Sequence, residues 1–162
     1  MKLVRYGEAG KEKPGILDVQ GAIRDLSGVV KDIDAAAVSP EGLARLRGVK
    51  VDSLQKVSGN PRLGPPMANV PKLICIGLNY ADHAKEANLP IPAEPVVFMK
   101  AISAITGPND DVKLPKGSKK GDWEVELAFV IGKKAQSVTE ADALNYVAGY
   151  TICNDVSERE WQ

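Results

Sequence analysis

The sequence has little of several features that would mark a specialised class of protein. Among its 162 residues are only two cysteines and one histidine, and Lys plus Arg equal Asp plus Glu at 21 each. A chain without net charge has no overall field to draw it onto nucleic acid or an anionic membrane surface, so we predict neither partner. With 44% hydrophobic and 26% charged residues, the composition is that of an ordinary globular protein.

Long hydrophobic runs are also missing. The longest, Leu127 to Ile131, is far shorter than the ~20 residues that a membrane-spanning helix requires. The charges of Lys2 and Arg5 interrupt the apolar residues at the amino terminus, which argues against a secretory signal. Cys75 and Cys153 each lie inside an apolar run, which favours reduced thiols over a disulfide framework. We therefore predict a cytoplasmic protein.

Two parts of the chain differ in composition. Residues 1–68 mix short β-like runs with turns and predict a small β-rich domain, whose one brief helix is capped by Ser39 and ended by Gly48. The stretch from Ser58 to Pro71 contains two glycines and four prolines, which is typical of a connection between compact units. Residues 69–162 would form a second domain, and the whole is predicted to be α+β and mainly β.

Local patterns are stronger in residues 69–162. Strands are predicted at Leu73 to Ile76, Val96 to Met99, Asp122 to Ile131 and Tyr146 to Asn154, and a helix at Asn79 to Asn88. Residues 157–160, Ser-Glu-Arg-Glu, have the pattern of a helix capping box with only two residues after it. We expect this pattern to start a longer helix, and therefore expect the intact protein to continue beyond the sequence.

The predicted strand from Asp122 to Ile131 places two carboxylates on one face. Side chains alternate along a strand, so Glu124 and Glu126 point away from the apolar side chains between them. Carboxylates on the same face repel each other unless a cation compensates, and Asp155 can supply a third. Such a set matches Mg²⁺ or Mn²⁺, with Ca²⁺ possible, better than zinc. The alternative is an ordinary amphipathic strand followed by an acidic turn residue.

Other polar residues are candidates for chemistry. His83 and Glu86 lie three apart in the predicted helix, so the carboxylate could orient the imidazole for proton transfer with water; a surface helix pair is the alternative. Lys100 follows the predicted strand Val96 to Met99, where it either reaches solvent or meets an anionic substrate. Arg159 and Gln162 are either substrate contacts or exposed residues of the final turn.

The sequence resembles the fumarylacetoacetate hydrolase family in four blocks that share its order and spacing. The blocks are residues 74–83, 94–100, 122–127 and 146–157. The resemblance covers about Lys72 to Gln162, and the preceding residues resemble the small N-terminal domain of bacterial members. It implies part of a catalytic domain with a β-roll or sandwich fold, a homodimer and a small oxo-acid substrate. A lysine and a Thr-Gly-Thr-Pro segment that family members carry further along are not in this sequence.

The resemblance also implies roles for single residues. Glu124, Glu126 and Asp155 would bind Mg²⁺ or Mn²⁺, His83 and Glu86 would act on water, and Lys100, Arg159 and Gln162 would contact the substrate. The implied activity is metal-dependent hydrolysis of a carbon–carbon bond in a substrate of the diketo acid type. Ureidoglycolate lyase, isomerase and decarboxylase activities are the alternatives within the family. Outside it, the alternative is a non-catalytic metal-binding fragment.

Overall fold

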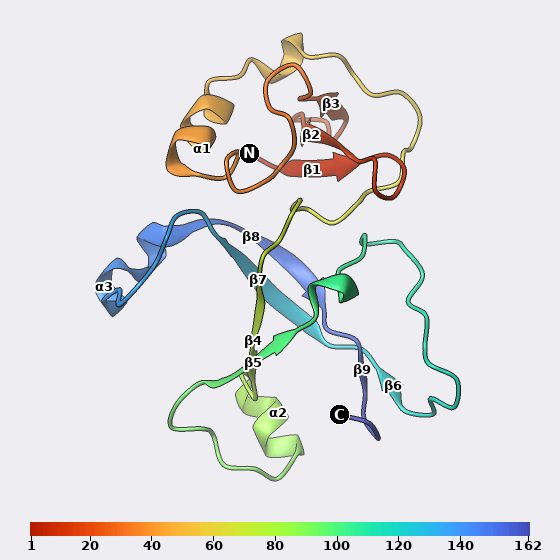
Figure 1. The fold of residues 1–162 in the computed structure, drawn as a ribbon, viewed down its shortest axis with the longest axis vertical. Coiled ribbons are helices and arrows are strands. Elements are labelled where there is room, and N and C mark those ends of the chain that lie inside the picture. The colour runs from red at the N-terminus through yellow and green to blue at the C-terminus, as the bar shows by residue number, and fades with distance from the viewer. The chain divides into compact units, whose positions relative to one another are not determined.

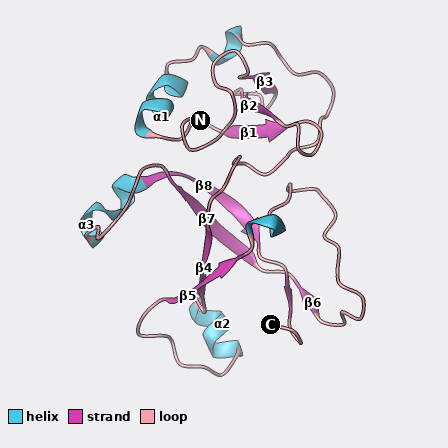
Figure 2. Cartoon of the chain, in the orientation of Figure 1, coloured by secondary structure: helices cyan, strands magenta, loops and turns pink.

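The computed structural model describes residues 1–162, whose contacts group them into two compact units. The first unit combines Met1–Ala68 with Gly107–Gln162, and the second is Asn69–Thr106. Strands outweigh short helices, which confirms the predicted mainly β fold (Figures 1 and 2). The predicted division into domains 1–68 and 69–162 is a different partition of the chain and stays a prediction.

The amino-terminal part of the first unit is a three-stranded antiparallel sheet with one helix. The strands β1 (Leu3–Tyr6), β2 (Lys13–Leu17) and β3 (Ile23–Asp25) pair in that order. The helix α1 (Pro40–Arg47) begins after Ser39, whose hydroxyl accepts a hydrogen bond from the Gly42 N–H at 3.0 Å. This bond satisfies one of the amides that the first helical turn leaves without a partner, as the sequence predicts. A short 3₁₀ helix, η1 (Val51–Ser53), follows.

The carboxyl-terminal part of the first unit is built on a long antiparallel strand pair. β7 (Val125–Ile131) pairs with β8 (Val147–Asn154), with a register shift between Val130 and Ile131. Between these strands come α3 (Glu140–Ala143) and η3 (Leu144–Tyr146). Two shorter strands, β6 (Gly121–Asp122) and β9 (Ser157–Glu158), pair with each other in the same antiparallel sense.

The two strand pairs form one ribbon with an unbroken register. The pairs Asp122–Ser157 and Val125–Asn154 are separated by two residues on each segment, so the alignment of β6 with β9 continues directly into that of β7 with β8. Only residues 123–124 and 155–156 fall outside the strands. The predicted strand from Asp122 to Ile131 is therefore interrupted at Trp123 and Glu124. Its residues nevertheless keep the same register against residues 147–157 on both sides of the interruption.

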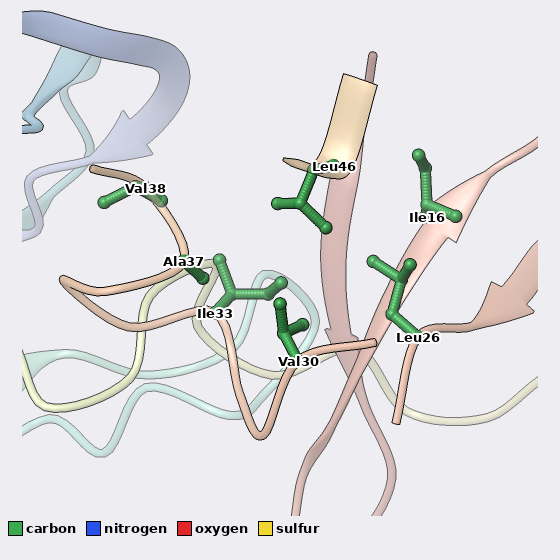
Figure 3. Close-up of a cluster of buried hydrophobic side chains, with 7 residues drawn as sticks. All are labelled: Ile16, Leu26, Val30, Ile33, Ala37, Val38 and Leu46. Carbon is green, nitrogen blue, oxygen red and sulfur yellow. The ribbon is translucent and has the colours of Figure 1, made fainter. Parts of the chain in front are cut away.

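The hydrophobic core of the first unit is a cluster of seven buried side chains. These are Ile16, Leu26, Val30, Ile33, Ala37, Val38 and Leu46 (Figure 3). Most belong to the segment between β3 and α1, which folds over the sheet residue Ile16 and the helix residue Leu46. Val130 of β7 and Ala148 of β8 pack against the same cluster. The ribbon is thus attached to the amino-terminal sheet by apolar contacts at one end.

A network of charged side chains also joins the two parts of the first unit. Arg5 donates hydrogen bonds to Asp32 at 2.7 and 3.0 Å and to Glu12 at 3.5 Å. Arg62 donates to Glu12 at 2.9 Å and, through two nitrogens, to Asp110 at 2.6 and 2.5 Å. The paired geometry is the strong, planar form of an arginine–carboxylate contact. Glu12 accepts from both guanidinium groups and is therefore the centre of the network.

The second unit is a strand pair with one helix. β4 (Leu73–Gly77) pairs antiparallel with β5 (Val96–Lys100), close to the predicted strands, and η2 (Ile102–Ala104) follows β5. The helix α2 (Ala81–Glu86) is shorter than predicted. It ends because Asn88 adopts a left-handed conformation with φ 54°, and the Leu89 N–H turns back to the Ala84 carbonyl at 2.9 Å.

The prediction that a helix starts at Ser157 is wrong. Ser157 and Glu158 form β9, and the chain then turns at residues 159–161. The Glu158 carboxylate accepts hydrogen bonds from the Ser118 hydroxyl and from the Lys120 N–H, the latter at 3.1 Å, so it binds the preceding loop instead of capping a helix. The hydrogen bond from Ser118 is the main reason why the pKa of Glu158 lies below its ordinary value.

The two cysteines and the helices bear on the predictions of reduced thiols and of no membrane-spanning helix. Cys75 in β4 and Cys153 in β8 form no disulfide, and both are half-buried. None of the helices has the combination of length and apolar composition that crossing a bilayer would demand.

One face of the β7–β8 pair is apolar and exposed. Half-buried and exposed side chains alternate along β7 and along most of β8. The exposed set is Val125, Leu127, Phe129, Ile131, Tyr150 and Ile152, and their exposure runs from 49% at Ile131 to 77% at Ile152. This arrangement confirms that the apolar residues of the strand lie opposite Glu126. Contiguous apolar side chains on a protein surface favour association.

We predict that the 162-residue chain self-associates through this face. Ile152→Lys should lower the apparent mass in multi-angle light scattering, because a charge at the most exposed position of the patch opposes burial. Asn145→Lys, which adds the same charge at an exposed position in η3, is the matched control and should leave the mass unchanged. Equal masses for Ile152→Lys and the unmodified chain would exclude the patch as the contact.

A second prediction concerns acid stability. Burial opposes ionisation of Glu12, but its bonds to Arg62 and the charge of Arg5 outweigh burial, so its pKa in the folded protein is lowered. A lowered pKa contributes stability above the ordinary glutamate pKa of about 4.3, and this contribution is lost as the pH falls through the folded value. Glu12→Gln should therefore be less stable at pH 7 and should lose less stability between pH 7 and pH 3.

Urea unfolding at the two pH values measures this difference. Glu8→Gln is the control, because Glu8 pairs only with Lys11 and both side chains are about four-fifths exposed, at 80% and 79%. If Glu12→Gln and Glu8→Gln lose the same stability on acidification, the network does not contribute through Glu12.

Candidate metal-binding site

The three predicted metal ligands lie where β7 begins and β8 ends. Glu126 is the second residue of β7 and faces Cys153, while Glu124 precedes β7 and Asp155 follows β8. The Asp155 N–H donates a hydrogen bond to the Glu124 carbonyl at 2.9 Å, so these two residues continue the ladder. Opposed residues of an antiparallel pair, and residues two apart on one strand, project from the same face. The backbone therefore places all three carboxylates on one face.

Burial supports this placement. Glu124, Glu126 and Asp155 are half-buried, whereas the intervening Val125 and the preceding Asn154 are exposed. The Asn154 side-chain oxygen accepts a hydrogen bond from the Glu124 N–H at 3.1 Å. Both backbone polar groups of Glu124 are thus hydrogen-bonded to residues 154 and 155, which fixes the interruption between β6 and β7.

Arg159 pairs with one carboxylate of this face. Its Nη1 lies 2.6 Å from Oε1 of Glu124, and its Nη2 and Nε lie 2.8 and 2.9 Å from Oδ2 of Asp122. Nη1 also donates to Oε1 of Gln162 at 3.1 Å. The hydrogen bond to Asp122 is the largest cause of a raised pKa for Arg159, burial opposes it, and Glu124 adds to it. The guanidinium group therefore bridges two carboxylates of the ribbon.

The type of ligand fits a hard divalent cation, but the side chains are not grouped as a formed metal cluster. Three carboxylates on one face offer the oxygen atoms that Mg²⁺, Mn²⁺ and Ca²⁺ prefer. No three His, Cys, Asp or Glu side chains are placed so that they could hold a metal ion together. One physical reason is visible at Glu124, whose carboxylate is bound to Arg159.

The remaining predicted residues belong to the second unit. His83 and Glu86 lie on α2 and are both exposed, and no hydrogen bond or ion pair joins their side chains. An open hollow of about 580 Å³ borders α2, but neither His83 nor Glu86 lines it. Lys100 is the last residue of β5 and is half-buried. The roles predicted for these residues stay predictions.

Sequence reasoning missed two residues of the first unit that organise the acidic face. Asp122 holds the Arg159 side chain, and Asn154 holds the Glu124 backbone. Asp122 could have been found, because it is two residues before Glu124 and the same alternation puts it on that face. The contact of Asn154 depends on the break in the strand, and no local pattern announces it.

These features define a class: a mainly β protein with three carboxylates on one face at the end of its longest strand pair. The sequence model described as fumarylacetoacetate (FAA) hydrolase C-terminal matches residues 72–162. The chain belongs to the fumarylacetoacetate hydrolase family, which confirms the resemblance seen in its sequence blocks.

Individual relatives agree with this assignment. A protein of Burkholderia cenocepacia (strain HI2424), whose name proposes a hydrolase and specifies no substrate, is 60% identical over 162 residues. The fumarylacetoacetate hydrolase of the psychrophile Exiguobacterium antarcticum is similar in structure, with a TM-score of 0.77 and 31% identity over 100% of this chain and 58% of its own. The 5-carboxymethyl-2-hydroxymuconate delta-isomerase of Mycobacterium smegmatis has a TM-score of 0.67 and 28% identity, over 100% of this chain and 57% of its own.

The chain is shorter than these relatives. It is covered completely by the Burkholderia cenocepacia protein but spans only 57% of that protein's length. Activity, substrate and partners of the whole protein are therefore matters of proposal.

Proposed function

We propose that the intact protein is a divalent-metal-dependent hydrolase that cleaves a carbon–carbon bond in a small oxo-acid of the diketo acid type. The observation that carries this proposal is the placement of Glu124, Glu126 and Asp155 on one face of the ribbon, inside the segment that matches the family. The name of the similar Exiguobacterium antarcticum protein supports a hydrolase. A cytoplasmic location and a homodimer are part of the same proposal.

The acidic face would provide the metal site. Glu124, Glu126 and Asp155 would hold Mg²⁺ or Mn²⁺, with Ca²⁺ as a further candidate. A cation bound there supplies a Lewis acid that stabilises negative charge on a carbonyl oxygen of the substrate. The backbone bonds of Glu124 to Asn154 and Asp155 keep two of the carboxylate-bearing residues opposite each other. The register of β7 with β8 sets the position of the third.

The other predicted residues would handle water and substrate. His83 would remove a proton from the attacking water, and Glu86, one helical turn away, would favour the imidazole orientation that accepts it. Lys100, Arg159 and Gln162 would bind the anionic and carbonyl groups of the substrate. Nε and Nη2 of Arg159 contact Asp122, so Nη1 is the nitrogen that would donate a hydrogen bond to a substrate carboxylate.

An isomerase is the second candidate, and one observation favours it. The similar Mycobacterium smegmatis protein is named a delta-isomerase. Isomerisation moves a proton without consuming water, so incorporation of ¹⁸O from labelled water into a newly formed carboxylate, whose oxygens do not exchange with water as ketone oxygens do, separates the two reactions. Ureidoglycolate lyase or decarboxylase activity would be recognised by release of urea or carbon dioxide. A non-catalytic metal-binding fragment would show none of these products.

The ligand assignment predicts that Glu126→Ala weakens Mn²⁺ binding. Loss of one of three carboxylates should raise the Kd at least about tenfold, because each supplies both charge and an oxygen atom. Isothermal titration calorimetry on the 162-residue chain gives the comparison. Glu140→Ala, which removes an exposed carboxylate from α3, is the control. Binding by Glu126→Ala as tight as that of the unmodified chain would show that Glu126 is not a ligand.

The role of His83 predicts a different pattern. In the intact protein, His83→Ala should lower kcat by about 10²- to 10⁴-fold and leave the Kd for Mn²⁺ nearly unchanged, since a general base is not a ligand. Turnover of a diketo acid is the measurement. Lys85→Ala, a change of an exposed neighbour on α2, should retain the activity. An unaltered kcat in His83→Ala would remove His83 from the mechanism.

A further inference from the structure

We infer that Arg159 acts as an internal cation that competes with a divalent metal ion for Glu124, and so sets the metal affinity of the site. This inference rests on the proposed metal site, but it concerns a step that comes before catalysis. Arg159 has to release the Glu124 carboxylate when a metal ion binds.

The competition follows from charge and distance. The contact of 2.6 Å between Nη1 of Arg159 and Oε1 of Glu124 is a short, charge-assisted interaction. A metal ligand approaches its ion to about 2.0–2.6 Å, so a divalent ion on Glu124 would lie close to the guanidinium group. Two positive groups on one partly buried carboxylate repel each other, because the Glu124 side chain is only 24% exposed and water screens the repulsion poorly. Binding of one cation therefore weakens binding of the other.

Asp122 would still bind the Arg159 side chain after Arg159 releases Glu124. Two of the three guanidinium nitrogens, Nη2 and Nε, contact Oδ2 of Asp122, and only Nη1 contacts Glu124. The backbone is fixed as well, because the Arg159 N–H donates to the Lys120 carbonyl at 3.0 Å. Release therefore needs a small rotation of the side chain and leaves the β6–β9 pair intact.

Release would also have a consequence for substrate binding. Once Glu124 turns to the metal ion, Nη1 of Arg159 keeps Gln162 as its neighbour at 3.1 Å and becomes available to a further acceptor. An anionic substrate offers such an acceptor. Metal binding and substrate binding would then be coupled positively through one nitrogen atom.

The test compares Mn²⁺ affinities of the 162-residue chain by calorimetry. Arg159→Gln should bind Mn²⁺ about fivefold more tightly or better, because a charge-assisted hydrogen bond no longer has to be broken. Arg159→Lys keeps the positive charge but lacks the planar guanidinium group. Its Mn²⁺ affinity should lie between those of the unmodified chain and of Arg159→Gln. Lys120→Gln removes an equal charge from a nearby residue that pairs with Glu160 at 3.1 Å, and should change the affinity less than twofold. Circular dichroism checks that each variant is folded.

The outcomes separate the inference from the proposed site. Tighter binding in Arg159→Gln, with Lys120→Gln unchanged, supports the competition. Equal or weaker binding in Arg159→Gln and Arg159→Lys, when the unmodified chain binds Mn²⁺, overturns the competition and leaves the metal site standing. The same gain in Lys120→Gln also overturns it, since any lost charge would then suffice. Absence of Mn²⁺ binding in every protein overturns the metal site together with the inference.

Discussion

The pairing of β7 with β8 is the constraint on which the rest of the site depends. Because side chains alternate, its register alone decides that Glu126 shares a face with Cys153 and that the large apolar residues occupy the other. A slip by one residue would exchange the two faces. The contacts of Val130 and Ala148 with the amino-terminal core oppose such a slip, since they would be lost. Packing at the other end of the strand pair thus keeps the carboxylates on the acidic face.

The sequence was informative wherever a structural rule acts over a few residues. The cap of α1 by Ser39, the strands near Leu73 and Val96, and the alternation around Glu126 all follow from neighbours in the chain. The prediction at Ser157 was wrong because the same residues can satisfy a distant strand. Its partner β6 has two residues, too few to show a period of two, and the loop donors for Glu158 lie about 40 residues away, as the separation of 38 from Lys120 shows.

The candidate site was predictable to a similar degree. The facing of Glu124 and Glu126 follows from alternation, and the position of Asp155 required only the next strand. The bridge from Arg159 to Asp122 and Glu124 was not predictable. Arg159 and Asp122 are 37 residues apart in the sequence, and their contact depends on a turn that replaces the expected helix. Resemblance to a family identifies residue types at a site, whereas the competing contacts between them are properties of the individual fold.

The ribbon has one further consequence, for folding. Glu124 and Asp155 are hydrogen-bonded neighbours, and the segment between them is shorter than the whole chain, so the loop that must close to bring them together costs somewhat less entropy than a contact between the ends of the protein. Proteins whose contacts have lower sequence separation fold faster. An isolated strand pair is only marginally stable, however, and this one is supported by the core around Leu46. The acidic face is therefore formed within one ribbon and stabilised by the amino-terminal hydrophobic core.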